Sequence, residues 1–241
     1  MQGWPAVVIA VVAGTLSGPV LRGRIFHHSV PSGQPWRREC PHCQHLVIRT
    51  TLAAVLPPTG KCPNCRKPIG PAPGTVEVLA AAVLAVVALR ADTWWTLAAW
   101  AWVGLIGVAL AFIDAAVHRL PDQMTYVAFV GVVVLLAGNG DVSGWFEAVA
   151  SGLGMALFYL VLAVVYPSGM GLGDVKLALS LGTALGWMGW VATVYGTALG
   201  FLLAAGYSLV MLALRKITRK DSIPHGPFMM VGAVLVPALL G

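Results

Sequence analysis

Charged residues are scarce in this sequence: only 10% of its 241 residues are Asp, Glu, Lys or Arg, whereas 58% are hydrophobic. A soluble domain carries about 25% charged residues. One core of this length cannot bury so much apolar side chain, so the composition excludes a water-soluble fold. Most of the chain is therefore expected to lie in lipid, as an all-α polytopic membrane protein.

The N-terminus also lacks the marks of a removed signal peptide. No basic stretch precedes the first apolar segment, and no small-residue cleavage pattern follows it. This segment is therefore expected to be retained as a helix.

The sequence does contain eight apolar segments. Four are long enough to cross about 30 Å of hydrocarbon at 1.5 Å per residue, at about residues 4–21, 94–113, 145–166 and 191–214. Four are shorter, with lengths that are also typical of re-entrant or interfacial helices, at about residues 76–89, 124–137, 175–190 and 228–240.

The basic residues orient these segments. Fourteen of the 15 Lys and Arg residues follow the C-terminal ends of long segments, and only Arg90 does not. Because basic loops stay in the cytoplasm, every long segment runs inward and every short one returns the chain. The sequence thus predicts about eight transmembrane helices with both termini outside. This topology and contact with membrane lipids explain the net charge of +6, so no nucleic-acid partner is expected.

Residues 23–74 interrupt the pattern with a polar stretch, rich in Pro and Cys, that is too long for a simple turn. By the same charge argument, this stretch is a small cytoplasmic insert. The chain is thus expected to divide into a first transmembrane helix at 1–22, the insert at 23–74 and a transmembrane core at 75–241.

All four cysteines lie in this insert as two C-x-x-C pairs with 18 residues between them: Cys40, Cys43, Cys62 and Cys65. This spacing is typical of a tetrahedral zinc site, in which two tight turns each present two thiolates to one ion. A closed shell of four thiolates leaves no position for water, so the zinc would be structural and the insert zinc-ribbon-like. Two disulfides or a redox C-x-x-C are the alternatives. A reducing cytoplasm disfavours the first, and the second matched pair disfavours the other.

Two aspartates are of interest because ionisable groups at membrane depth are costly and usually functional. Asp114 lies near the cytoplasmic end of its segment, where snorkelling or pairing with His118 would explain it equally well. Asp174 follows glycines at alternate positions, among them Gly171 and Gly173, which would let an extended peptide approach. The alternatives are a flexible hairpin in which Asp174 caps the next helix and, more weakly, a phosphate-binding loop, for which the G-x-G-x-x-G fingerprint is lacking.

The predicted topology places Asp114 and Asp174 at similar depth, each at the cytoplasmic end of a helix. Two carboxylates in one site cannot easily both be ionised, so one tends to hold a proton. The ionised member could take a proton from water while the protonated member donates one to a carbonyl oxygen. This is the chemistry of aspartic proteolysis, and it needs no metal. Asp122 has a simpler expected role, which is to cap the helix that follows it.

Together these features resemble the prepilin peptidases, also called type IV leader peptidases, within the Gly-x-Gly-Asp intramembrane aspartyl proteases. Residues 171–177, Gly-Leu-Gly-Asp-Val-Lys-Leu, look like the family's second catalytic motif, and residues 112–122 look like its first. Glu77, residues 224–228 and the paired C-x-x-C loop also match family patterns. The resemblance covers nearly the whole chain and implies a multi-pass protein of the bacterial inner membrane whose active site faces the cytoplasm.

The resemblance implies that Asp114 and Asp174 are catalytic and that Gly171, Gly173 and Lys176 contact the substrate. The implied reaction is cleavage of the N-terminal leader of type IV prepilins, or of the pseudopilins of type II secretion, just before a hydrophobic helix. Many bacterial members also methylate the new N-terminus with S-adenosylmethionine. Here the residues around the cysteines depart from the commonest family pattern, which weakens the case for methyl transfer more than that for proteolysis.

Two other classes of function also fit the residues. A transporter or channel could use the same aspartates to relay ions or protons, with the zinc module as a gate or docking element, although matched halves and broken helices are not evident. A scaffold of a pilus or secretion machine with degenerate catalysis is the other alternative, and the presence of both aspartates argues against it.

Overall fold

The computed structural model describes residues 4–49, 54–167, 169–218 and 221–240, and the regular structure in these ranges is entirely helical. The expected all-α fold is therefore confirmed. Arg219 and Lys220, two of the basic residues that orient the chain, lie outside the described residues. Eight helices follow one another in these ranges: α1 (Trp4–His28), α2 (Thr75–Arg90), α3 (Trp94–Val117), α4 (Asp122–Ala137), α5 (Val142–Val165), α6 (Leu172–Gly186), α7 (Trp190–Ala213) and α8 (Gly226–Leu240).

Each helix corresponds to one of the predicted apolar segments. Helices α1, α3, α5 and α7 have 24 or 25 residues and are long and apolar enough to cross a membrane. Helices α2, α4, α6 and α8 have only 15 or 16 residues. The protein is therefore a multi-pass helical membrane protein in which long and short helices alternate along the chain.

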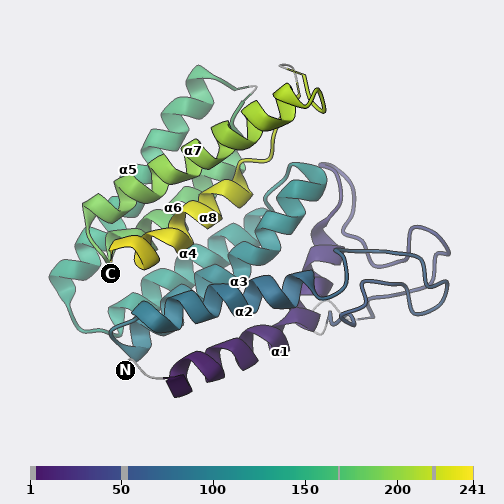
Figure 1. Ribbon diagram of the computed structural model, residues 1–241, viewed down its shortest axis with the longest axis horizontal. Coiled ribbons are helices and arrows are strands. Elements are labelled where there is room, and N and C mark those ends of the chain that lie inside the picture. Colours follow the sequence, from purple (N-terminus) through teal and green to yellow (C-terminus); the bar gives the residue numbers. More distant parts are fainter. Residues whose placement is uncertain (1–3, 50–53, 168, 219–220, 241) are drawn as a thin grey trace.

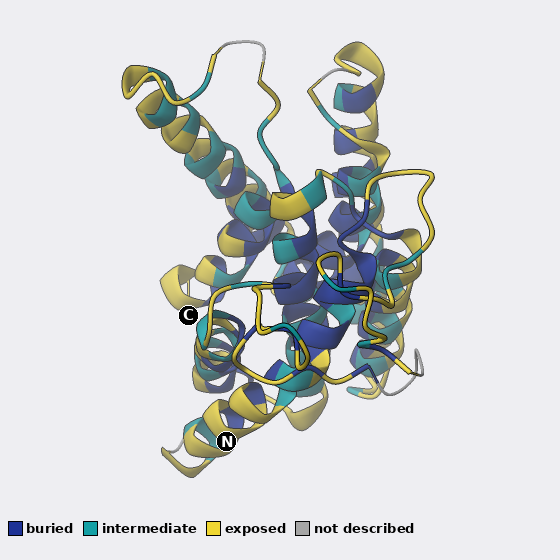
Figure 2. Ribbon diagram, turned by 90° about the vertical axis from the view of Figure 1, so that its right-hand side faces the viewer, coloured by how far each residue is buried: buried dark blue, intermediate teal, exposed yellow. Residues whose placement is uncertain are grey.

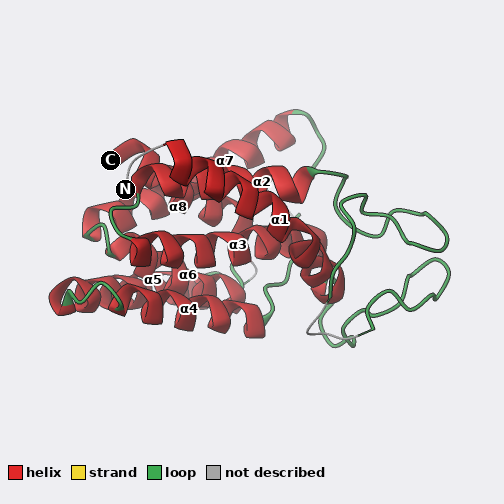
Figure 3. Cartoon of the chain, turned by 90° about the horizontal axis from the view of Figure 1, so that it is seen from below, coloured by secondary structure: helices red, strands yellow, loops and turns green. Residues whose placement is uncertain are grey.

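The polar insert and the two termini lie at opposite ends of the helical bundle. Figure 1 shows α1 beginning and α8 ending on one side of the bundle, while the insert between α1 and α2 projects from the other side. Seen from below in Figure 3, the insert forms two long loops that extend beyond the helix ends. The insert therefore partly covers the end of the bundle that lies opposite the two termini.

Neighbouring helices approach each other through small residues. A Cβ on Gly182 of α6 would lie 2.9 Å from the Cα of Gly152 on α5, so these backbones are almost in contact. Gly232 on α8 lies in the same way against Gly196 and Gly200 of α7. Such contacts are typical of membrane helices, whose association depends on close van der Waals packing.

The outer faces of the helices are apolar as well. Figure 2, with the insert end toward the viewer, shows buried residues in the interior and exposed residues around the outside. Side chains that are more than half exposed include Leu157, Val161 and Val164 on α5 and Leu202 and Leu209 on α7. Exposed leucines and valines in such numbers would be unfavourable in water, and lipid is the solvent that suits them.

Helix α1 continues seven residues past its predicted end at residue 21. The sequence suggested an end there because Arg22 follows, but Arg22 is buried, with 2% of its surface exposed. Its guanidinium binds both carboxylate oxygens of Glu77 on α2, at 2.7 and 2.8 Å. It also donates to the carbonyl oxygens of Pro71 and Ala72, at 2.8 and 2.9 Å. With these donors satisfied, Arg22 does not need water, and the helix continues beneath the insert.

Candidate active site and candidate metal centre

Asp114 lies on the last turn of α3, where only 6% of its surface is exposed. The helix ends at Val117, and its C-cap residue, His118, has a left-handed backbone (φ 49°) and an N–H that donates to the Asp114 carbonyl oxygen. The carboxylate accepts a hydrogen bond of 3.0 Å from the backbone N–H of Gly226, the first residue of α8. A Cβ on residue 226 would lie 2.9 Å from that carboxylate oxygen. Glycine is therefore needed for this approach, and α8 orients the Asp114 side chain.

Asp174 lies on the first turn of α6 and is also buried, with 8% of its surface exposed. Its Oδ2 accepts a hydrogen bond of 3.1 Å from the backbone N–H of Gly171, the residue that precedes the helix. The helix-capping role considered for Asp174 is thus present in the structure. This bond uses only one oxygen of the carboxylate, because Oδ1 makes no hydrogen bond with any described residue.

The two carboxylates lie in one polar cleft of about 540 Å³ at the insert end of the bundle. Its walls come from the end of α3, the α3–α4 turn, the first turns of α4 and α6, and one residue of the insert. The residues that line it are Trp36, Asp114, His118, Arg119, Leu120, Asp122, Gln123, Gly171, Leu172, Gly173 and Asp174. The structure thus brings together the two aspartates that the sequence singled out, although they are sixty positions apart.

The three residues predicted to contact a substrate have different surroundings. Gly171 and Gly173 line the cleft, whereas Lys176 does not. A Cβ on Gly173 would lie 2.9 Å from the Cβ of Leu120, so this glycine lets α6 begin against the α3–α4 turn. The Lys176 ammonium lies 2.7 Å from Oδ1 of Asp122 and thereby links α6 to α4.

Asp122 does not cap α4 with its side chain, so that expectation was wrong. Pro121 occupies the N-cap position, and no side chain accepts a hydrogen bond there. The Asp122 carboxylate binds Lys176 instead, because α6 brings this cation within reach of the α4 N-terminus.

The four cysteines form a compact cluster whose sulfur atoms all lie within 4.8 Å of one another. The Sγ atoms of Cys40 and Cys65 are 3.8 Å apart, as are those of Cys43 and Cys62. Sulfurs at the corners of a tetrahedron with Zn–S bonds of about 2.3 Å would be roughly 3.8 Å apart. None of the four is in a disulfide.

Both C-x-x-C pairs adopt the same local structure. An isolated antiparallel bridge closes each turn, Glu39 with Leu46 and Lys61 with Pro68. In each turn the residue after the second cysteine, Gln44 or Arg66, has a left-handed backbone with φ 57°. Two matching turns that face each other fit the predicted zinc-ribbon-like insert, and the four thiols could hold one metal ion.

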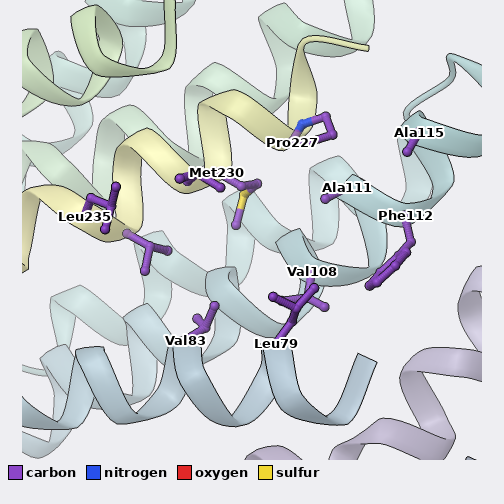
Figure 4. A pocket seen from close by; sticks show the side chains of 11 residues that line it. Leu79, Val83, Val108, Ala111, Phe112, Ala115, Pro227, Met230 and Leu235 are labelled. Atoms are coloured by element: carbon purple, nitrogen blue, oxygen red, sulfur yellow. The ribbon is translucent and has the colours of Figure 1, made fainter. Parts of the chain in front are cut away.

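A second cavity, of about 320 Å³, lies between α2, α3 and α8, and no polar or titratable side chain lines it. Figure 4 shows Leu79 and Val83 from α2, Val108 and Phe112 from α3, and Met230 from α8 around it. All of the side chains that line this cavity are apolar. The polar cleft with its two carboxylates is therefore the better candidate for an active site.

Sequence reasoning did not single out Trp36, and it noted residues 224–228 only as matching a family pattern, without a role for any of them. Trp36, from the insert, forms part of the cleft wall, and an aromatic residue within a polar stretch was the only available signal. His225, which precedes Gly226, binds the hydroxyl of Tyr159 through Nε2 at 3.2 Å and packs against Phe201. These contacts fix the start of α8, and they pair residues too distant in sequence to be recognised as partners.

A multi-pass helical protein with two buried carboxylates in a polar cleft at one end of its bundle has the arrangement of an intramembrane aspartyl protease. Comparison with known proteins agrees: residues 101–212 match the model of the type IV leader peptidase family, and this range includes Asp114 and Asp174. The chain belongs to the type IV leader peptidase family.

Several curated relatives extend over most of the chain. It is 34% identical to the prepilin leader peptidase/N-methyltransferase of Aeromonas hydrophila over 204 residues, covering 80% of this chain and 68% of the relative. It is 30% identical to the protein of the same name from Pseudomonas aeruginosa, again over 80% of this chain and 68% of the relative. The Legionella pneumophila relative is 28% identical over 83% of this chain and 71% of its own length. No solved structure matches the chain.

Proposed function

We propose that this protein is an intramembrane aspartic endopeptidase that removes the N-terminal leader of type IV prepilins or pseudopilins. The observation that carries the proposal is the placement of Asp114 and Asp174, both buried, in one polar cleft of a chain from this family. The names of the curated relatives supply the substrate class. The family membership also disfavours the transporter considered from the sequence.

In the proposed reaction, the ionised aspartate takes a proton from a water molecule whose oxygen attacks the scissile carbonyl carbon. The protonated aspartate donates its proton to the carbonyl oxygen. When the C–N bond breaks, the leaving amine takes the proton that the first aspartate had accepted from water. The second aspartate takes back a proton from a hydroxyl group of the tetrahedral intermediate, and the leader departs with a new carboxyl group, so the pair returns to its starting state. The backbone N–H groups of Gly226 and Gly171 hold the two carboxylates in place. Gly171 and Gly173 line the cleft in which an extended substrate would lie. Leu120 packs against Gly173 where a side chain would otherwise be, and Lys176 would act through Asp122.

We further propose that all eight helices cross the bacterial inner membrane, with the insert and the cleft on the cytoplasmic side. The separation of the termini from the insert in Figure 1 supports this topology, as does the distribution of basic residues in the sequence. The division into a first helix, an insert and a transmembrane core is part of the same proposal. Its one adjustment is that α1 continues to His28.

The proposed reaction is tested with purified protein in detergent and a synthetic peptide that spans a prepilin leader junction. Wild-type protein should release the leader, detected by mass spectrometry, whereas the transporter alternative would instead show ion flux in proteoliposomes. Leader release also sets the baseline for the aspartate substitutions argued in the Discussion.

The insert is proposed to hold one structural zinc ion through Cys40, Cys43, Cys62 and Cys65. We expect about one zinc per chain in purified wild-type protein, and well under half of that in Cys40→Ser, because a thiolate ligand is lost. Elemental analysis by plasma mass spectrometry measures both values. Ser29→Ala, a buried serine outside the cluster, should keep its zinc. Wild-type protein that contains no zinc, or a Cys40→Ser variant that keeps all of it, would contradict the assignment.

The second activity in the relatives' names, N-methyl transfer, has less support in this chain. A cavity of about 440 Å³ lies between the insert and the end of α3, and Ser29 and Arg37 are its polar side chains. It has no Asp or Glu, the usual partner of ribose hydroxyl groups in a nucleotide site. The lining therefore does not fit S-adenosylmethionine well, and no methyl-transfer step is assigned to these residues.

The contact between Gly226 and Asp114 gives a direct prediction. In Gly226→Ala the added methyl group would lie 2.9 Å from the carboxylate, so Asp114 must move. We expect kcat to fall about a hundredfold, because misplacing a reacting group by about 1 Å costs that much. The measurement is steady-state cleavage of the leader peptide. Gly206→Ala on α7 is the matched control, since its Cβ would meet nothing within 4 Å and kcat should not change. Equal activity of the two variants would exclude an orienting role for Gly226.

A further inference from the structure

Trp36 belongs to the insert, yet its side chain forms part of the cleft that contains the two aspartates. The backbone around it is fixed to the end of α1. The N–H of Arg37 donates to the carbonyl oxygen of His27 at 2.9 Å, and Nδ1 of His27 lies 2.9 Å from the carbonyl oxygen of Arg37. The indole also packs against the ring of His28, with centroids 4.7 Å apart. These contacts hold Trp36 as a wall of the cleft.

Arg119 connects the transmembrane core to this wall. It lies in the α3–α4 turn, five residues after Asp114, and its guanidinium carbon is 4.7 Å from the centroid of the Trp36 ring. Its Nη1 donates to the carbonyl oxygen of Pro31 in the insert at 3.4 Å. A guanidinium group has five N–H donors, so most of the donors of Arg119 are not used by these contacts.

The charge on Arg119 is not balanced by a carboxylate, although three aspartates line the same cleft. Lys176, the other cation nearby, is neutralised by Asp122, whereas Arg119 forms no ion pair with any described residue. Packing against an aromatic ring positions a guanidinium and leaves its edge free to donate. Arg119 is therefore a fixed cation with unused donors beside the proposed catalytic pair.

We propose that Arg119, held in place by Trp36, binds the oxygen atoms of the leader segment of the substrate. The inference rests on the proposed function, with the insert and the cleft on the cytoplasmic side, and it takes the leader to run from the scissile bond toward the insert. Trp36 and Arg119 line the same cleft as the two aspartates, so a peptide that enters this cleft from the insert side would lie against them. The planar donors of a guanidinium match backbone carbonyl and carboxylate oxygens. The insert is therefore part of the substrate-binding cleft as well as a metal-bound module.

The test is a cycle in which both the enzyme and the substrate are changed. Arg119→Met and Trp36→Leu are compared with wild type on a full leader peptide and on one shortened to the two residues before the scissile bond. Either change alone should lower kcat/KM about tenfold, mainly through KM, which corresponds to about 1.4 kcal/mol. Both together should lower it little more than either alone, because they remove the same contact. Trp36→Phe, which keeps an aromatic face for the guanidinium, should recover most of the loss.

Two comparisons distinguish a leader subsite from a general effect of charge or of folding. Lys67→Met removes an exposed cation of the insert that does not line the cleft, and it should leave KM unchanged. Zinc content and the thermal unfolding midpoint of Arg119→Met should equal those of wild type. If shortening the leader and changing Arg119 or Trp36 lower kcat/KM by independent factors, so that the combined loss is their product, the leader subsite is overturned. The proposed peptidase activity would still stand in that case. Wild-type protein that cuts neither peptide would instead overturn the proposed function.

Discussion

Asp174→Asn and Asp114→Asn are each expected to lower kcat for leader cleavage at least about a thousandfold. An amide cannot take a proton from water or donate one as an acid, and loss of one member of a cooperating pair removes most of the catalysis. Asparagine is chosen because its size and its carbonyl oxygen are preserved. That oxygen can still accept the hydrogen bond from Gly171 or Gly226, so the helix ends should remain folded. Single-turnover cleavage of the leader peptide measures the effect.

Asp141→Asn is the matched control for these substitutions. Asp141 is the N-cap residue of α5 and, like the two buried aspartates, accepts a backbone hydrogen bond, from Gly144 at 3.0 Å, but it does not line the cleft. Its variant should cleave at the wild-type rate, so a general effect of losing one aspartate would be recognised. An Asp174→Asn protein with near wild-type kcat would show that water is activated by other groups.

The second large effect is expected at Arg22, whose side chain is only 1% exposed in its ion pair with Glu77. Arg22→Met leaves the Glu77 carboxylate without its partner and also removes the donors to Pro71 and Ala72. Breaking one side of a buried ion pair costs about 3–5 kcal/mol of folding free energy. For a chain of this size we expect the thermal unfolding midpoint to fall by about 10 °C. Differential scanning fluorimetry in detergent provides the measurement.

Two variants show whether burial or pairing causes this loss. Arg24 is in the same turn but only half-buried, and its side chain makes no hydrogen bond to any described residue, so Arg24→Met should unfold close to the wild-type midpoint. The double variant Arg22→Met with Glu77→Leu should be more stable than Arg22→Met alone, because no unpaired charge stays buried. A double variant that is less stable than the single one would argue against this account.

Much of the fold could be predicted because lipid imposes simple requirements on a chain. A membrane helix must be apolar over a set length, and this requirement predicted the positions of all eight helices to within a few residues, apart from the C-terminal end of α1. The end of α1 was missed because Arg22 is charged, and charge usually marks a boundary. Its partner Glu77 is 55 residues away, and no local pattern predicts such a pair.

The candidate site could be predicted only in part for a similar reason. Asp114 and Asp174 were identifiable because carboxylates are rare in apolar segments. Their orientation by backbone N–H groups was not, because the Gly226 contact joins residues 112 positions apart. Lys176 was grouped with the substrate-binding residues by motif, whereas the structure pairs it with Asp122. Trp36 was overlooked because only the fold of the insert brings it beside Arg119.

The alternation of long and short helices has a consequence for the surrounding membrane. Helices of 15 or 16 residues, such as α4, α6 and α8, reach only about 22–24 Å, less than the roughly 30 Å of a hydrocarbon layer. In the proposed topology all three begin at the cytoplasmic face, beside the aspartates. A helix shorter than the hydrocarbon layer is accommodated by local thinning of the bilayer, by snorkelling of flanking residues or by association with other helices. In the proposed topology, thinning beside these three helices would bring headgroups and water closer to the scissile bond. Acyl-chain length would then act on the rate of proteolysis through hydrophobic mismatch, and the host lipid would be a determinant of the enzyme's efficiency.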